Sequence, residues 1–158
     1  MANHLSDYAK RVRGMPVAGG AEVISVRMVV PLPATHAVND IIEFGELPED
    51  HVPVDFVLDA ADIDTNVTPT VILAASLLNA AKTDLSAGAD DGGANWLTAS
   101  AIGQAGGMAR PTVRAMWLTN PLPTTKRMLG AKITTGAATA AAGDVAMTIN
   151  YRSAHFGR

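Results

Sequence analysis

The stretch VPVDFVLDA, residues 52–60, shows the clearest alternation of apolar and polar side chains in the chain. Successive residues of a β-strand point to opposite faces of the sheet, so one face of this segment is expected to be apolar. That face would be formed by Val52, Val54, Phe56 and Leu58. The pattern therefore predicts a β-strand that packs one side against a hydrophobic core.

Pro53 lies inside this segment and has no backbone N–H to give to a neighbouring strand. The strand is therefore expected to begin at the edge of a sheet or beside a β-bulge. Alternating or continuous apolar patterns predict further short strands on both sides of it. These segments are residues 22–30, 40–48, 70–79, 110–120, 128–136 and 144–152, of which 70–79 is also compatible with a short helix.

The predicted strands are short and are separated by turns that contain proline, glycine and aspartate, whereas helical periodicity is almost absent. This organisation predicts an all-β fold, an antiparallel sandwich or barrel, formed by a single domain over residues 22–158. The last two strands are expected to pair through the Gly, Ala and Thr linker at 136–143. The expected core residues are Ile24, Val26, Met28, Val54, Phe56, Leu58, Val113, Trp117, Ile133, Val145, Met147 and Ile149.

Composition narrows the possible functions of this domain. The 158 residues include no cysteine, which excludes disulfides, thiolate metal sites and a cysteine nucleophile. It also fits a protein that folds in a reducing cytoplasm. Apolar runs fall short of the ~20 residues of a membrane helix, and the first residues lack the apolar stretch of a signal peptide. We therefore expect neither a membrane partner nor an export signal.

The charged residues are unevenly distributed along the chain. Residues 31–64 hold nine acidic and no basic side chains, whereas residues 110–132 hold five basic and no acidic ones. This segregation would give a bipolar surface if the two segments stay apart, or vanish if folding mixes them. The net charge of −3 and the 4% aromatic content argue against nucleic-acid binding.

Sequence motifs for catalysis or cofactor binding are missing, so neither an enzyme nor a cofactor is expected. The histidines (His4, His36, His51 and His155) are scattered along the chain, without the spacing of metal ligands on one element. The corner Asp59, Asp62 and Asp64 offers oxygen ligands, but an EF-hand loop beginning at Asp62 would lack the required glycine and final acid. A turn in which aspartates accept hydrogen bonds from nearby amides is the better interpretation, and cation binding stays an open alternative.

Two segments are candidates for binding a partner. Residues 1–21 are predicted to be a flexible arm, mobile in the free protein, that forms a short helix or hook on a partner surface. Residues 80–107 form a long segment rich in Gly, Ala, Ser and Asp, which would pack against a second chain or fold back over its own sandwich. The proposed partner-binding residues are Leu5, Tyr8, Lys10, Arg11, Val12, Arg13, Trp96 and Leu97.

The order of these features resembles that of the small decoration, or cementing, proteins of tailed bacteriophage heads. The similarity lies in the loose arm, in the stretch VNDIIEFGELPEDHVPVDFVLDAADIDT at 38–65, and in the closing Ala, Gly and Thr linker before a strand that ends in Tyr151. It extends over about residues 22–152 and includes no catalytic signature.

This resemblance implies a jelly-roll-like sandwich without enzymatic activity. It also implies a virion protein, made in the host bacterial cytoplasm, that binds the major capsid protein on the outer capsid surface as a homo-oligomer, a dimer or trimer. Related small β proteins occur in phage tails and head fibres, so a tail or host-attachment role is one alternative. An enzymatic or ligand-binding sandwich is the other, and it would require a concave pocket with convergent polar groups.

Overall fold

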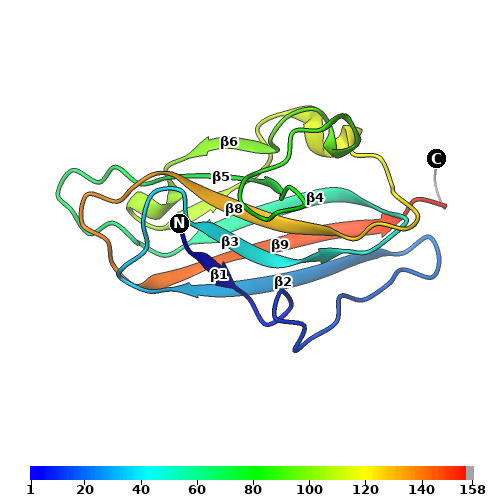
Figure 1. Ribbon diagram of the computed structural model, residues 1–158, viewed down its shortest axis with the longest axis horizontal. Coiled ribbons are helices and arrows are strands. Elements are labelled where there is room, and N and C mark those ends of the chain that lie inside the picture. Colours follow the sequence, from blue (N-terminus) through cyan, green and yellow to red (C-terminus); the bar gives the residue numbers. More distant parts are fainter. Residues whose placement is uncertain (156–158) are drawn as a thin grey trace.

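The computed structural model describes residues 1–155, which form a sandwich of two β-sheets (Figure 1). One sheet has the strand order β1-β3-β8-β5-β6 and the other β2-β9-β4-β7. The strands are β1 (Asn3–Leu5), β2 (Val23–Leu32), β3 (Ile41–Leu47), β4 (His51–Ala60), β5 (Ile72–Leu77), β6 (Leu97–Ser100), β7 (Gly107–Ala109), β8 (Arg127–Thr135) and β9 (Gly143–Ser153). Three short 3-10 helices lie between strands: η1 (Ala89–Asp91), η2 (Ile102–Gln104) and η3 (Arg114–Leu118).

The strand pairing is that of an eight-stranded jelly roll. β2 pairs with β9, β3 with β8, β4 with β7 and β5 with β6, all antiparallel. The strands β2 to β5 thus run against β6 to β9 like one long hairpin, which is rolled so that alternate pairs fall in opposite sheets. The predicted all-β, antiparallel, jelly-roll-like sandwich is confirmed. The inner faces of both sheets enclose one main hydrophobic core.

β4 explains the position of Pro53. Its pairing with β9 shifts between Pro53 and Asp55, which marks the predicted β-bulge. β7 pairs with β4 only at Leu58–Ala60, so the first part of β4 also lies at the sheet edge. The bulge reverses the alternation, with the result that Phe56 and Leu58 are fully buried whereas Val54 is only partly buried.

Residues 110–120 are not the predicted strand. The chain before them supplies two strands instead: β6 lies within the long 80–107 segment, and β7 begins at the last residue of that segment, Gly107. Pro111 cannot donate a ladder hydrogen bond, and residues 114–118 instead form η3. Trp117 is consequently 58% exposed, which corrects its expected place in the core. Its indole Nε1–H donates to Val54 O at 2.9 Å, at the bulge of β4. The other expected core residues are buried, except Ile24, Val54 and Val113, which are partly buried.

The linker between β8 and β9 crosses from one sheet to the other, so the expected pairing of these two strands is wrong. Asp64 holds this crossing in place. Its carboxylate accepts hydrogen bonds from the amides of Thr70, Val71, Ala138 and Thr139 at 2.6–3.1 Å. Burial raises the pKa of Asp64, but these amides outweigh it and lower the pKa well below the usual range. The predicted aspartate turn is confirmed, because the Asp62 side chain also accepts the Asp64 amide at 3.1 Å.

Candidate interaction surfaces

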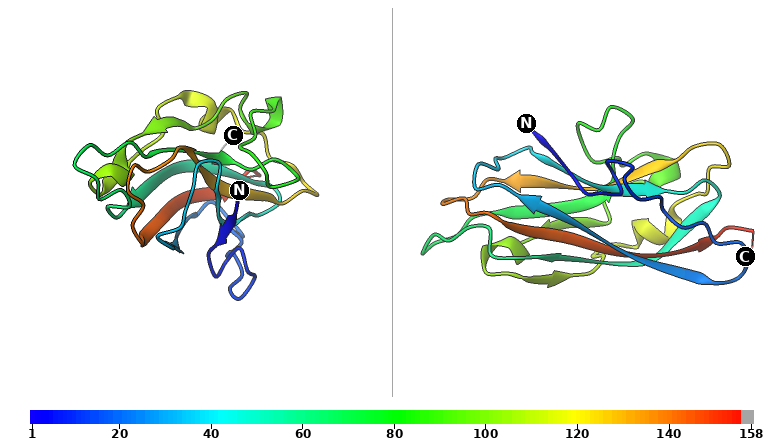
Figure 2. Two further views of the ribbon diagram at one scale, coloured as in Figure 1. Left: turned by 60° about the vertical axis from the view of Figure 1, so that its left-hand side comes forward. Right: turned by 90° about the horizontal axis from the view of Figure 1, so that it is seen from below.

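The N-terminal arm is attached to the sandwich along the side where β3 and β2 approach each other (Figure 2). β1 adds to the edge of β3 as a parallel strand, with Asn3 opposite Ile41 and Leu5 opposite Glu43. This placement corrects the expectation of an arm without a fixed position. The attachment of the arm could not be predicted from a local pattern, because it depends on polar contacts between residues about 40 positions apart in the sequence.

Asp40, which is buried just before β3, is the first anchor of the arm. It accepts hydrogen bonds from the Ala2 amide at 2.5 Å and the Ala37 amide at 3.0 Å, and its Oδ2 lies 3.1 Å from His4 Nε2. Burial raises the pKa of Asp40, but the contacts with Ala2, His4 and Ala37 outweigh it and hold the pKa below its usual value. The start of the chain is therefore tied to a carboxylate in the body of the fold.

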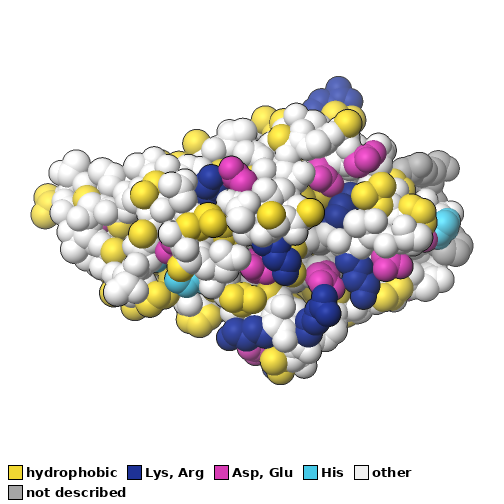
Figure 3. All heavy atoms as spheres, in the orientation of Figure 1, with side chains coloured by type: hydrophobic (Ala, Val, Ile, Leu, Met, Phe, Trp, Pro, Cys, Tyr) yellow, Lys and Arg dark blue, Asp and Glu magenta, His cyan; other side chains and the backbone are white. Residues whose placement is uncertain are grey.

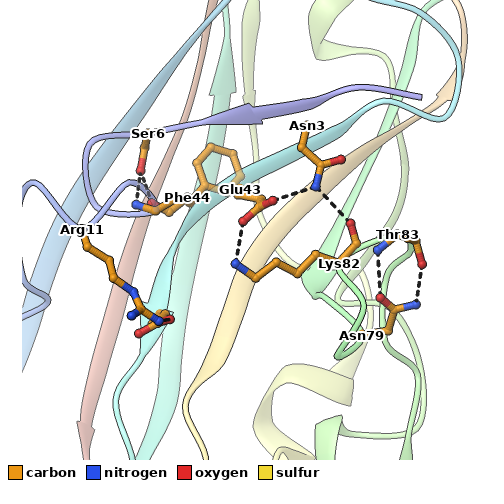
Figure 4. Close-up of polar contacts among 10 residues, drawn as sticks. Asn3, Ser6, Arg11, Glu43, Phe44, Asn79, Lys82 and Thr83 are labelled. Atoms are coloured by element: carbon orange, nitrogen blue, oxygen red, sulfur yellow. Dashed lines mark hydrogen bonds and ion pairs between the residues drawn. The ribbon is translucent and has the colours of Figure 1, made fainter.

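Glu43 is the second anchor, and it joins three parts of the chain (Figure 4). Its carboxylate is buried on the outer face of β3, where it accepts a hydrogen bond from Asn3 Nδ2 at 2.8 Å and forms an ion pair with Lys82 Nζ at 3.0 Å. Asn3 Nδ2 also lies 3.3 Å from Lys82 O, so the arm, β3 and the loop after β5 meet at one point. A buried carboxylate needs such partners, because an unpaired one would carry a large desolvation penalty.

Apolar contacts complete the attachment of the arm. Ala9, Ile41, Leu78 and Met128 form a second, small hydrophobic cluster, against which the half-buried Leu5 packs. This cluster covers the outer face of the β3 sheet, which would otherwise expose apolar side chains to water.

The turn that follows β1 depends on two residues: Ser6 fixes it by hydrogen bonds, and Gly45 leaves room for it. The Ser6 hydroxyl donates to Phe44 O and accepts from the amides of Tyr8 and Ala9, both at 3.1 Å. Gly45 provides the necessary space, because a Cβ there would lie 3.1 Å from Tyr8 Cβ and 2.8 Å from the core atom Met28 Sδ. Tyr8 is accordingly partly buried against the main core.

The later part of the arm has its own fixed points at the far end of the sandwich. The buried Tyr151 hydroxyl donates to Pro16 O at 2.6 Å. The Ala18 amide donates to His51 Nε2 at 2.9 Å, and His51 Nδ1 donates in turn to Glu49 O at 2.6 Å. His51 therefore links the arm to the start of β4 through both of its ring nitrogens.

Residues 10–14 join these two attached parts and form an exposed loop, which we call the arm loop. Lys10, Arg11, Val12 and Arg13 are all exposed, and the Val12 side chain is 71% exposed. In the left view of Figure 2 this part of the chain projects away from the sheets, and Figure 3 shows basic side chains gathered over the same region.

A shallow hollow of about 310 Å³ separates the arm loop from the body of the sandwich. It is lined by Tyr8, Arg11, Arg13, Gly14, Met15, Val17, Glu46, Pro48 and Lys126. Arg11 crosses it and pairs with Glu46 at 2.9 Å, and both groups are partly solvated. An exposed pair of this kind contributes little to stability, so Arg11 remains available to a competing acidic partner.

The sequence prediction placed Trp96 and Leu97 on the surface as partner-binding residues, but both side chains are buried. Trp96 is completely buried and its ring centroid lies 5.9 Å from that of Phe56, while Leu97 is 1% exposed in β6. The segment 80–107 folds back over its own sandwich, so these two side chains offer no surface to another chain. The prediction treated a glycine-rich segment as having little core of its own to pack against, whereas Trp96 and Leu97 are part of the main core.

Three large exposed apolar side chains that the sequence prediction missed lie along the edge of the β4 sheet. Met108 in β7 is 75% exposed, and Trp117 and Leu118 at η3 are 58% and 46% exposed. Trp117 was assigned to the core from an apparent strand pattern, so nothing in that pattern could have identified it as a surface residue. Exposed aromatic residues are common in protein interfaces, which makes this edge a second candidate surface.

Folding mixes the charged segments that are separate in the sequence. Asp55 pairs with Arg110, and Asp59 with Arg27 through two hydrogen bonds. On the other sheet Lys132 pairs with Asp84 at 2.9 Å, and the buried Arg127 lies 3.4 Å from Asp91. Asp55 of the acidic stretch thus lies beside Arg110 of the basic stretch, and Asp59 is matched by a base from β2.

Within the described residues, no group of three or more His, Asp or Glu side chains is arranged to hold a metal ion. Two hollows of about 350 Å³ have linings that are partly polar and partly apolar, and one of them lies between Lys82, Asp91 and Arg127. Across residues 1–155 no helix is both long and apolar enough to cross a membrane. The geometry defines the class of fold, an all-β jelly-roll sandwich of two sheets.

Comparison of the chain with known proteins shows which proteins it is similar to. No family model matches the chain, and no curated protein does. A solved structure described as the capsid of Ralstonia phage GP4 contains a chain with 31% identity and a TM-score of 0.81, and the match covers 96% of this chain and 97% of that one. The protein therefore belongs to the phage capsid-related proteins, with a structural role in the virion.

A chain in the capsid asymmetric unit of cyanophage Pam1 has the same fold, with a TM-score of 0.65. Its sequence identity is 23%, and the match covers 88% of this chain and 90% of that one.

Proposed function

We propose that this protein decorates and cements the phage head by binding the lattice of the major capsid protein from outside, as a homo-oligomer and without catalytic activity. The observation that supports this most directly is the similarity over nearly the whole chain to a protein in the capsid of Ralstonia phage GP4. A jelly roll by itself hosts many unrelated functions, so the fold alone would not carry the proposal.

The arm loop is the surface that we assign to the capsid contact. It combines an exposed valine with exposed cationic side chains, and arginine is enriched in protein interfaces. Lys126 adds a further positive charge on the body side of the neighbouring hollow. Such a surface fits an acidic, partly apolar patch on the partner, where opposite charges steer the encounter and fix its register.

A binding experiment with head particles that lack this protein tests the assignment. The double variant Lys10→Glu and Arg13→Glu reverses two exposed charges without changing the buried anchors of the arm. We expect co-sedimentation with the particles to weaken by roughly tenfold at low salt, with a smaller difference at high salt. Val67→Glu, which adds a negative charge to a fully exposed side chain between β4 and β5, is the control and should bind like the natural chain.

Two outcomes separate the possible failures. Equal binding of the double variant and the natural chain would contradict the role of the arm loop but keep the capsid role. Failure of the natural chain itself to bind any head particle, while it binds tails, would overturn the decoration proposal.

A further inference from the structure

The arm is attached to the sandwich at two separate places, an arrangement that would let its first part move to another molecule. Its first part, residues 1–9, is attached at the edge of β3, and its second part, residues 15–18, is attached through Tyr151 and His51 at the far end. Only the exposed arm loop connects the two attachments. The first attachment can therefore open while the second remains in place.

The arm loop is tightly folded in its present conformation. The amides of Lys10, Arg11 and Val12 donate to Ser6 O, Tyr8 O and Asp7 O at 2.9–3.0 Å, which turns the chain back on itself. Arg11 has a φ angle of +60°, a left-handed conformation that is unfavourable for a residue with a side chain. Short connections under this kind of strain favour exchange of the attached segment, because opening the connection removes the strain.

We propose that residues 1–9 exchange between copies of this chain, so that β1 of one molecule pairs with β3 of a second. The contacts of the first attachment run from residues 1–9 to Asp40, Glu43, Phe44 and Lys82 on the body. None of them depends on the two parts belonging to one molecule. When extended, the five residues of the arm loop reach about 17 Å, enough to cross a direct contact between two sandwiches.

The buried carboxylates beside the edge of β3 favour the arm sequence over other strands, because they contact groups of Ala2, Asn3 and His4. Asp40 accepts from the Ala2 amide and contacts His4, while Glu43 accepts from Asn3, and both carboxylates are buried. A foreign strand without these donors would remove the arm's hydrogen bond from one oxygen of each buried carboxylate, Asp40 Oδ1 and Glu43 Oε1, which is unfavourable. A second copy supplies the same donors in the same register, so exchange keeps every anchor satisfied.

Introduced cysteines provide a direct test, because the natural chain has none. Leu5 and Glu43 lie opposite each other in the β1–β3 pair, a spacing that suits a disulfide. Chains carrying only Leu5→Cys and chains carrying only Glu43→Cys are unfolded together in equal amounts, refolded at high concentration and oxidised. Each chain alone then lacks a partner cysteine, and a mixed disulfide can form only if the arm lies on another molecule.

We expect a mixed disulfide in up to half of the Leu5→Cys chains, since half of the edges are of the other kind and Glu43→Cys removes one of the two anchors there. The double variant Leu5→Cys with Glu43→Cys is the geometric control and should give disulfide-linked multimers at high concentration. If the double variant closes within single chains while the mixture gives no mixed disulfide, the proposal is wrong.

Variants of the arm loop give a second readout that needs no cysteine. Arg11→Gly removes the strain of the left-handed residue and should shift the protein toward monomers in light scattering, whereas Lys10→Gly, its neighbour without a positive φ, should shift it less. An unchanged oligomer distribution in both variants would contradict the inference. Because all measurements use the free protein, their failure is independent of capsid binding.

Discussion

Replacing Asp40 by asparagine should release the start of the arm without unfolding the sandwich. Asp40 holds the arm through the Ala2 amide at 2.5 Å and through His4 at 3.1 Å, and it also accepts from the Ala37 amide. An asparagine keeps the size of the side chain but replaces one acceptor oxygen by an N–H₂ group. At least one donor in this buried site then faces another donor.

The free energy lost by the attached arm can be worked out from this unpaired donor. A buried polar group left without its partner destabilises the attached state by about 1–3 kcal/mol, which corresponds to a roughly 5- to 150-fold higher population of the detached arm. Hydrogen exchange measured on the peptide that covers residues 1–9 reports this opening directly. Its protected amides include that of Ser6, which donates to Glu43 O at 3.0 Å. We expect their exchange to accelerate by this factor, while exchange in β9 stays unchanged.

The same site predicts a dependence on pH. Because the folded protein lowers the pKa of Asp40, its contribution is fully present above the pKa of an unfolded aspartate, about 3.9, and is lost as the pH falls further. The natural chain should thus lose arm protection in acid, and Asp40→Asn should show less of this change. Asp7→Asn, an exposed change in the same arm, is the control. Equal protection of residues 1–9 in Asp40→Asn and the natural chain at neutral pH would refute the anchoring argument.

Three other changes test the core and its supports. Phe56→Ala should lower the free energy of unfolding, measured with denaturant, by roughly 3–5 kcal/mol, since the ring is fully buried against Trp96. A loss below about 1 kcal/mol would show that the site collapses without leaving a cavity. Gly92→Ala should prevent correct folding near η3, because Gly92 has φ +95° and a Cβ would lie 2.0 Å from Ala115 O, and native exchange protection there would contradict this. Tyr151→Phe should loosen residues 15–18 by about 1 kcal/mol, seen as faster exchange of the Ala18 amide, whereas unchanged exchange would exclude Tyr151 as an anchor.

The strands could be predicted from the sequence wherever one face alternates with the other. In β2 and β9 the alternation of side chains records which face meets the core, so Met28 and Met147 are assigned correctly. Pro53 likewise indicated a bulge or edge, because the missing N–H is a property of the residue itself. The fold class follows from such local signals together with the absence of helical periodicity.

The candidate surfaces were only partly predictable. The exposed basic residues of the arm loop were found because charge and length favour exposure wherever the chain places them. Trp96 and Trp117 were assigned the wrong way round, one to an interface and one to the core. Their burial depends on which segments lie above them, and a tryptophan is compatible with either environment.

The sequence by itself determined the all-β class, most strand positions, the turn at Asp64 and the basic character of the arm loop, because each depends on residues close together in the chain. Only the tertiary structure decided that β8 and β9 lie in different sheets, that β6 arises from the glycine-rich segment, and that the arm is held by Asp40 and Glu43. These features depend on contacts between residues tens of positions apart. Such contacts form when distant segments fill one core and satisfy one another's buried polar groups, which no local pattern records.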